Sequence, residues 1–128
     1  MAYVIGCLMA GLSFLLNRLL LKYIGIKVVI SYSPVVEELT KTLCSYYLAA
    51  DILVTHIIFG VLEAGYDWFK EQNKQCGTIA ALLSIIGHTL FGGITVFVFH
   101  LSSSIFIGIL VGVGVHLAWN VTLIRLTN

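Results

Sequence analysis

Four polar signatures interrupt a chain that is otherwise almost entirely apolar. They are the segments 34–41 (PVVEELTK) and 59–63 (FGVLE), the single His88, and the segment 116–120 (HLAWN). A charged side chain at the centre of a bilayer costs about 3 kcal/mol or more, so ionisable residues inside membrane helices indicate a functional site. Carboxylate, imidazole and amide groups together can activate water and stabilise an oxyanion. The pattern predicts a polar site inside a membrane protein and favours an intramembrane protease.

The composition sets the class of protein. The chain has 128 residues and 10% charged side chains, against about 25% in soluble domains, and its mean hydropathy is +1.03. We therefore expect one integral membrane domain over residues 1–128. The net charge of +1 indicates no strongly charged partner, and no basic patch predicts nucleic-acid binding. Cys7, Cys44 and Cys76 have no metal-site spacing and are predicted to be free thiols.

The apolar segments predict an all-α bundle of about five transmembrane helices, each near the 17–25 residues that a span needs. The expected ranges are about 2–16, with a continuation past Asn17 and Arg18 left open, and about 34–49, 52–69, 78–99 and 105–124. Ser33 and Pro34 predict the start of the second helix, as a capping residue followed by proline. The conformation of residues 22–30 is left open. The first apolar run lacks a positive leader, so we expect it to be a retained helix.

The basic residues predict the orientation. Arg18, Lys22, Lys27, Lys70, Lys74 and Arg125 flank the expected helices. With five spans, all of them fall on one side. The positive-inside rule then places the N-terminus outside and the C-terminus in the cytoplasm. We expect the cell membrane as the location.

Helical spacing places the polar residues of each helix on one face. The faces are Glu37, Glu38, Lys41 and Ser45; His56, Phe59, Gly60, Glu63 and Asp67; Ser84, His88, Gly92 and Thr95; and Gly108, Gly112, His116 and Asn120. Glu37 and Lys41 are predicted to pair at i,i+4. Some of these residues also have structural interpretations: a helix dipole stabilises first-turn carboxylates, and Glu63 can pair with Lys41. His56, nearer the outer end, is interpreted as a packing histidine.

The four faces converge in depth. Measured from the cytoplasmic side at 1.5 Å per residue, the carboxylates, His88, His116 and Asn120 fall within a layer of roughly 10–15 Å. The sequence therefore predicts one polar site between helices two to five, with residues 34–124 as its four-helix core.

In this order on successive helices, the motifs resemble the PrsW family of intramembrane proteases, which is related to the CAAX prenyl proteases and bacteriocin-processing proteins. The resemblance rests on three motifs and one histidine: Pro34-x-x-Glu37-Glu38-x-x-Lys41, Phe59-x-x-x-Glu63, His88, and His116-x-x-Trp119-Asn120. Lys41 and Glu63 replace an arginine and a histidine of the wider group, as in the PrsW variant. The matched region is about two-thirds of the chain.

The resemblance implies a peptidase mechanism. Glu37 would act as general base, with Glu38 in support and Lys41 orienting a carboxylate. Glu63 and His88 would position the water, and His116 and Asn120 would donate hydrogen bonds to the oxyanion. Metal-free catalysis is expected. Zinc is the alternative, and its candidate ligands are Glu37, Glu63, His88 and His116.

The implied partners are the lipid bilayer and a membrane-anchored protein or lipidated peptide as substrate. Two other functions stay open from the residues alone. Intramembrane carboxylates and histidines also form proton or ion relays, for which a homo-oligomer would supply the missing repeat. A non-catalytic binding or immunity protein with this fold is the other alternative.

Overall fold

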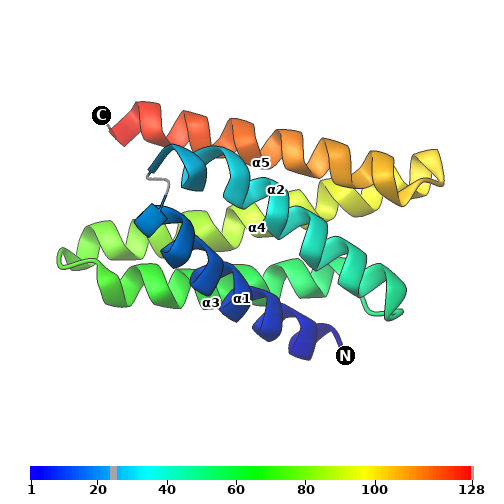
Figure 1. The fold of residues 1–128 in the computed structure, drawn as a ribbon, viewed down its shortest axis with the longest axis horizontal. Coiled ribbons are helices and arrows are strands. Elements are labelled where there is room, and N and C mark those ends of the chain that lie inside the picture. Colours follow the sequence, from blue (N-terminus) through cyan, green and yellow to red (C-terminus); the bar gives the residue numbers. More distant parts are fainter. Residues whose placement is uncertain (24–25, 128) are drawn as a thin grey trace.

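A computed structural model describes residues 1–23 and 26–127, and these form five α-helices without a strand. The helices are α1 (Ala2–Tyr23), α2 (Ile26–Tyr47), α3 (Ile52–Lys70), α4 (Lys74–Ser102) and α5 (Ile105–Thr127). Successive helices alternate in direction along one long bundle (Figure 1). The predicted all-α fold is confirmed.

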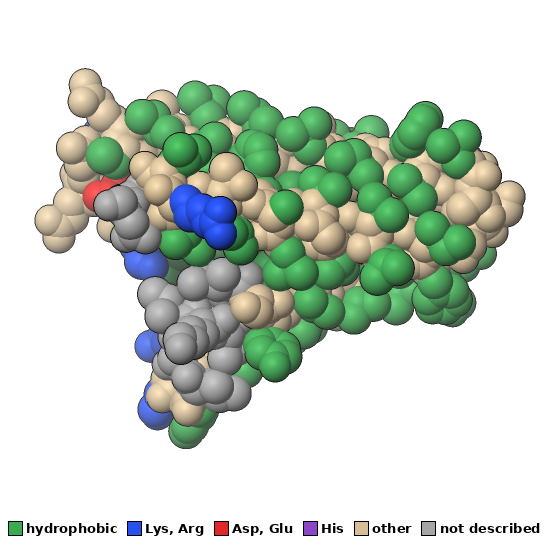
Figure 2. Space-filling model, turned by 90° about the horizontal axis from the view of Figure 1, so that it is seen from above, with side chains coloured by type: hydrophobic (Ala, Val, Ile, Leu, Met, Phe, Trp, Pro, Cys, Tyr) green, Lys and Arg blue, Asp and Glu red, His purple; other side chains and the backbone are tan. Residues whose placement is uncertain are grey.

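The outer surface of the bundle is apolar along most of its length. Four helical stretches are long and apolar enough to cross a membrane: Ala2–Leu20, Ile52–Lys70, Lys74–Ser102 and Ile105–Leu126. Large side chains such as Leu110 and Leu101 are exposed on this surface. Figure 2 shows hydrophobic side chains over the long body of the molecule and Lys and Arg gathered toward one end. The chain is a membrane protein on these grounds.

The second helix begins earlier than the sequence predicted. It starts at Ile26, and Pro34 lies inside it rather than at its first position. Proline removes one backbone hydrogen bond from a helix, whereas ending the helix there would leave several backbone groups without intrahelical partners. Ser33 therefore does not cap the helix, and it is buried instead. Of the segment left open in the prediction, Ile24 and Gly25 lie outside the described residues.

The connections between the later helices are short and capped. The side chain of Asp51 accepts a hydrogen bond from the backbone N–H of Val54 at the start of α3, at 2.9 Å. Asn73 caps α4 through the N–H groups of Gln75 and Cys76. These caps satisfy N–H groups that have no partner inside the helix. They therefore cap the helices that follow the α2–α3 and α3–α4 connections.

Glycines set the close packing of α3 against α4. A Cβ atom at Gly60 would lie 2.9 Å from the Cβ of His88, and one at Gly92 would lie 2.7 Å from the Cβ of His56. Each helix thus accommodates a histidine of its neighbour opposite a glycine. Small residues allow this approach in membrane bundles. This reciprocal packing of a histidine against a glycine brings the imidazole rings of His56 and His88 to the interior of the bundle.

The interior is divided into an apolar part and a polar part. Ile52, Ile105 and Ile109 form an apolar cluster near the α4–α5 turn. In the described part of the chain α2 packs against α1, α3 and α5 but not directly against α4. The space between α2 and α4 is bridged by side chains, of which Lys41 and His88 meet at 3.1 Å. The polar residues gather in this space.

Candidate active site

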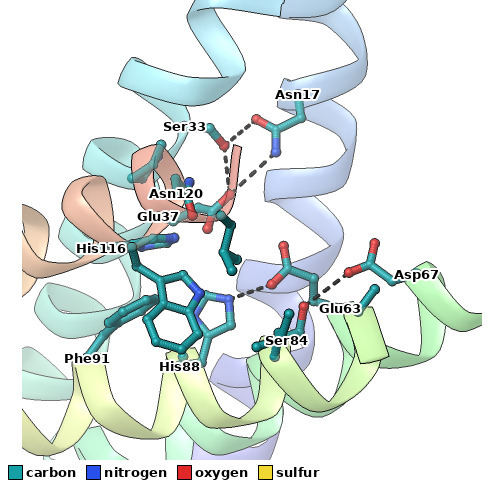
Figure 3. A pocket seen from close by; sticks show the side chains of 16 residues that line it. Asn17, Ser33, Glu37, Glu63, Asp67, Ser84, His88, Phe91, His116 and Asn120 are labelled. Atoms are coloured by element: carbon teal, nitrogen blue, oxygen red, sulfur yellow. Dashed lines mark hydrogen bonds and ion pairs between the residues drawn. The ribbon is translucent and has the colours of Figure 1, made fainter. Parts of the chain in front are cut away.

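A cavity of about 330 Å³ lies among all five helices. Its polar lining comprises Asn17, Ser33, Glu37, Glu63, Asp67, Ser84, His88, His116 and Asn120. Figure 3 shows Glu37, His116 and Asn120 close together, with His88 and Glu63 reaching in from α4 and α3. At least one residue of each of the four signatures lines this cavity, whereas Glu38 and Lys41 do not, and α1 adds Asn17 to the lining.

Glu37 is buried and faces the cavity with one oxygen already held. Its Oε1 accepts a hydrogen bond from Ser33 Oγ at 2.7 Å and from Asn17 Nδ2 at 3.4 Å. Ser33 Oγ also lies 2.5 Å from Asn17 Oδ1 (Figure 3). Neither Asn17 nor Ser33 was predicted as a site residue. Asn17 lies on α1, outside the motifs, and only its polarity in an apolar helix marks it in the sequence.

Glu38 lies deeper and is fully buried. Its Oε1 accepts hydrogen bonds from Lys41 Nζ at 2.8 Å and His116 Nδ1 at 3.0 Å, and its Oε2 is 2.9 Å from His56 Nε2. The predicted i,i+4 pair of Glu37 with Lys41 is therefore wrong: Lys41 pairs at i,i+3 with Glu38. The i,i+3 partner is the carboxylate that points into the protein, where an ammonium most needs an anion.

His88 joins the two carboxylate regions. Its Nδ1 lies 3.1 Å from Lys41 Nζ, and its Nε2 lies 2.6 Å from Glu63 Oε2. An ammonium donates and cannot accept, so Nδ1 is the acceptor and the ring proton is on Nε2, which donates to Glu63. Glu63 thus reaches Lys41 through His88. The ammonium also lies 4.2 Å from the centroid of Phe59, which places the aromatic residue of the second motif beneath the charge.

His116 is held on two sides. Its ring stacks on Phe91 with centroids 4.3 Å apart, and its Nδ1 contacts the carboxylate of Glu38. An ionised carboxylate only accepts hydrogen bonds, so Nδ1 carries a proton, and in the neutral ring Nε2 then keeps its lone pair. Ligand atoms of Glu37, His88 and His116 lie within 4.8 Å of one another. In this tautomer His116 can accept a hydrogen bond in the cavity, which differs from the donor role predicted for it.

Asn120 lies one turn beyond His116 and lines the same cavity with Trp119. Its side-chain amide has no hydrogen-bond partner within residues 1–23 and 26–127. The glycines that precede these residues on the same face, Gly108 and Gly112, are buried where α5 meets Thr95 of α4. The predicted face of α5 is confirmed, and it leaves an amide donor facing the cavity.

The cavity continues toward the end of the bundle where the basic residues lie. A second cavity of about 630 Å³ between α1 and α3 shares Asn17, Glu63 and Asp67 with the first. Arg18 and Lys70 line its outer part. Asp67 accepts a hydrogen bond from Ser84 at 3.0 Å at the junction. The lining of the second cavity therefore reaches from the polar site to the basic end of the bundle.

The donor set does not fit a zinc ion as it stands. Zinc needs an unshared lone pair from each histidine ligand. His88 has none to offer, because Lys41 donates to its Nδ1 and its Nε2 proton is directed at Glu63. Glu37, His88 and His116 offer ligand atoms within 4.8 Å of one another, and Glu63 is not part of this group. In the present arrangement of hydrogen bonds only Glu37 and His116 of the three have a lone pair free for zinc.

Comparison with known proteins gives no match to a family model, a curated protein or a solved structure. The site is therefore defined by its own geometry: two adjacent carboxylates with different partners, a buried lysine, two cavity histidines and a free amide.

Proposed function

We propose that this protein is an intramembrane endopeptidase that hydrolyses a peptide bond of a membrane-associated protein or peptide. The observation that carries the proposal is the position of Glu37 in the cavity, with its ligand atom within 4.8 Å of those of His88 and His116. One water molecule bridges two acceptors at this separation, because each hydrogen bond is about 2.8 Å long. The resemblance to the PrsW family, in which these residues belong to the motifs, supports the same reaction.

The reaction begins with the water between Glu37 and His116. Both groups accept hydrogen bonds, so they orient the water oxygen toward a substrate carbonyl in the cavity. Glu37 takes a proton as the oxygen attacks the carbonyl carbon, and Asn120 donates a hydrogen bond to the oxyanion that forms. Glu37 then gives the proton to the leaving amine as the C–N bond breaks. The products are a carboxylic acid and an amine, and the base is regenerated.

The remaining residues hold these groups in place. Ser33 and Asn17 fix one oxygen of Glu37, so the other is the one available to water. Glu63 orients His88, and Lys41 balances the charge of Glu38. Preorganised hydrogen bonds of this kind lower the cost of charge development in a site shielded from bulk water.

The substrate would enter from the bilayer, and water from the basic end of the bundle. We place that end in the cytoplasm and the protein in the cell membrane, following the positive-inside rule. A proton-handling bundle is the second candidate. The chain of hydrogen bonds from Glu63 through His88 and Lys41 to Glu38 favours it, although a fixed ammonium in the middle opposes proton passage.

The test is cleavage of membrane-anchored peptides by purified protein in nanodiscs, with fragments identified by mass spectrometry. Glu37→Gln keeps the shape of the side chain but removes the base, so turnover should fall by about 10² or more. Glu71→Gln changes an exposed carboxylate between α3 and α4 in the same way and should leave turnover unchanged. A folded Glu37→Gln protein with normal cleavage would exclude Glu37 as the base.

Pumping or leak of protons by proteoliposomes, without peptide cleavage, would instead support the second candidate.

A further inference from the structure

We infer that His56 is a positioning residue: an imidazolium that holds Glu38 and thereby fixes which nitrogen of His116 carries the proton. His56 does not line the cavity and lies outside the motifs. The assignment of its protons follows from hydrogen bonding alone, whereas its effect on catalysis rests on the proposed function.

Both ring nitrogens of His56 face oxygen acceptors. Nδ1 lies 2.9 Å from the backbone carbonyl oxygen of Ile52, and Nε2 lies 2.9 Å from Glu38 Oε2. A carbonyl oxygen accepts but never donates, so Nδ1 carries a proton. The second contact also needs a proton between its two atoms, on either Nε2 or Oε2. The side chain is fully buried, so bulk water does not compete for either contact.

The surrounding charges place the second proton on His56. Lys41 is fully buried, and its ammonium contacts Glu38 Oε1 and the unprotonated Nδ1 of His88. A buried ammonium needs an anion in direct contact, and Glu38 is the carboxylate that supplies it. Glu38 is therefore ionised, and His56 donates from both nitrogens. Glu38 and the carboxylate of Glu63, reached through His88, balance the two cations.

The consequence reaches the cavity through the other oxygen of Glu38. With Oε2 bound by His56, the carboxylate plane is fixed, and Oε1 accepts from His116 Nδ1. The proton of His116 is thereby held on Nδ1, and Nε2 presents its lone pair to the water. A carboxylate without the His56 bond can rotate, and the two tautomers of His116 then become closer in energy. Outer partners that fix a histidine tautomer in this way change activity without touching the substrate.

The fold makes room for this histidine specifically. A Cβ atom at Gly92 of α4 would lie 2.7 Å from the Cβ and 2.8 Å from the Cγ of His56. Only a residue without a side chain at 92 lets the ring lie between α3 and α4 and reach Glu38. A histidine that served packing alone would fill this space, but it would not control the tautomer of His116.

The experiment compares His56→Gln and His56→Leu with the wild-type protein in nanodiscs. His100→Gln, an exposed histidine on α4, is the matched control. Nitrogen-15 NMR of the histidine rings reports which nitrogens carry protons, and thermal unfolding in detergent reports folding. For cleavage of a membrane-anchored peptide, kcat and KM are measured on the folded fraction.

In the wild type we expect His56 to be protonated on both nitrogens and His116 on Nδ1 alone. In His56→Leu the His116 signals should shift toward mixed tautomers, and kcat should fall by about 10–100-fold, the range for outer partners of a functional histidine. KM should stay unchanged because His56 does not line the cavity. His56→Gln, which keeps one donor toward Glu38, should retain more of the Nδ1 tautomer and of kcat.

Two results would overturn the inference. One is a wild-type His56 with an unprotonated ring nitrogen, which needs no variant to detect. The other is an unchanged His116 tautomer in folded His56→Gln and His56→Leu. If the proton positions are as expected but the wild-type protein cleaves no peptide, the proton assignment is supported and the proposed peptidase function fails.

Discussion

At the scale of single residues, the two adjacent glutamates of the site have different surroundings and therefore different expected roles. Glu37 lies at the cavity with partners from polar uncharged side chains, and Glu38 lies in the protein interior with three nitrogen-containing partners. The first arrangement leaves a carboxylate oxygen available for chemistry. The second uses both oxygens for structure. We therefore expect substitutions of Glu37 to affect mainly turnover and substitutions of Glu38 to affect mainly stability.

Replacing Glu38 should destabilise the protein far more than replacing Glu37. Glu38→Gln leaves the buried Lys41 without its anion, which costs about 3–5 kcal/mol. The double variant Glu38→Gln/Lys41→Met removes both charges and should recover much of that loss. Urea-dependent unfolding in mild detergent measures each value. Equal stability of Glu38→Gln and Glu37→Gln would contradict the assignment of Glu38 as the counter-ion of Lys41.

Whether the site binds zinc also depends on individual residues, above all on His88. Because both nitrogens of His88 are already engaged, we expect the purified protein to hold well below one zinc ion per chain. Chelators should change neither its unfolding temperature nor its turnover, since a zinc-dependent fold or site would lose both. Mass spectrometric metal analysis provides the measurement. Zinc near one per chain, lost in His116→Ala, would show that the side chains rearrange around an ion.

At the scale of elements, the site depends on how closely α3 and α4 pack. Gly60 and Gly92 each face a histidine of the opposite helix, so the helices lie close enough for His56 and His88 to reach α2. The α2 helix supplies the carboxylates but does not pack directly on α4 in the described ranges. The polar site occupies the space that this arrangement leaves.

A methyl group at Gly60 should push the helices apart. Gly60→Ala places a Cβ 2.9 Å from that of His88 and 3.1 Å from the carbonyl oxygen of Ser84, and overpacking of this kind costs about 1–3 kcal/mol. Gly93→Ala is the matched control on α4, because nothing lies within 4 Å of its added Cβ. It should be neutral or stabilising by up to about 1 kcal/mol.

Thermal unfolding in detergent gives the comparison between the two variants. If Gly60→Ala is as stable as Gly93→Ala, the close approach of α3 to α4 at His88 is not required.

At the scale of the whole molecule, charge and apolar surface set its place in a membrane. The exposed body is covered with hydrophobic side chains, and cationic side chains gather at one end (Figure 2). Arg18, Lys22, Lys70, Lys74 and Arg125 all lie near the helix ends on this side (Figure 1); the side chain of Lys27 is outside the described residues. Both cavities have residues from this end of the bundle in their lining.

The positive-inside rule predicts that this end is cytoplasmic. In a variant whose only thiol is Cys76, near the start of α4, a membrane-impermeant maleimide should label the protein only after cells are opened. In a variant whose only cysteine is Ser103→Cys, at the α4–α5 turn, labelling should occur in intact cells. The opposite pattern would reverse the orientation and place the polar cavities on the outer side.

The sequence by itself determined the membrane class, the helical fold, and the inward faces of α2 to α5. These follow from hydropathy and from the 3.6-residue repeat, which are local properties. Glu37, His88, His116 and Asn120 could be assigned to one site because their depths agree. Helix ends were less well predicted: α2 begins before Pro34, because an interior proline costs only one backbone hydrogen bond and an early end costs several.

Only the tertiary structure decided which polar groups pair. Lys41 has Glu37 and Glu38 at equally suitable spacings, and the choice of Glu38 depends on His88, His56 and His116, which come from three other helices. The contacts of Asn17 with Glu37 and of His56 with Glu38 likewise depend on how the helices pack. A hydrogen bond depends on distances of about 3 Å between groups far apart in the chain, and helix packing sets such distances, whereas helical periodicity does not.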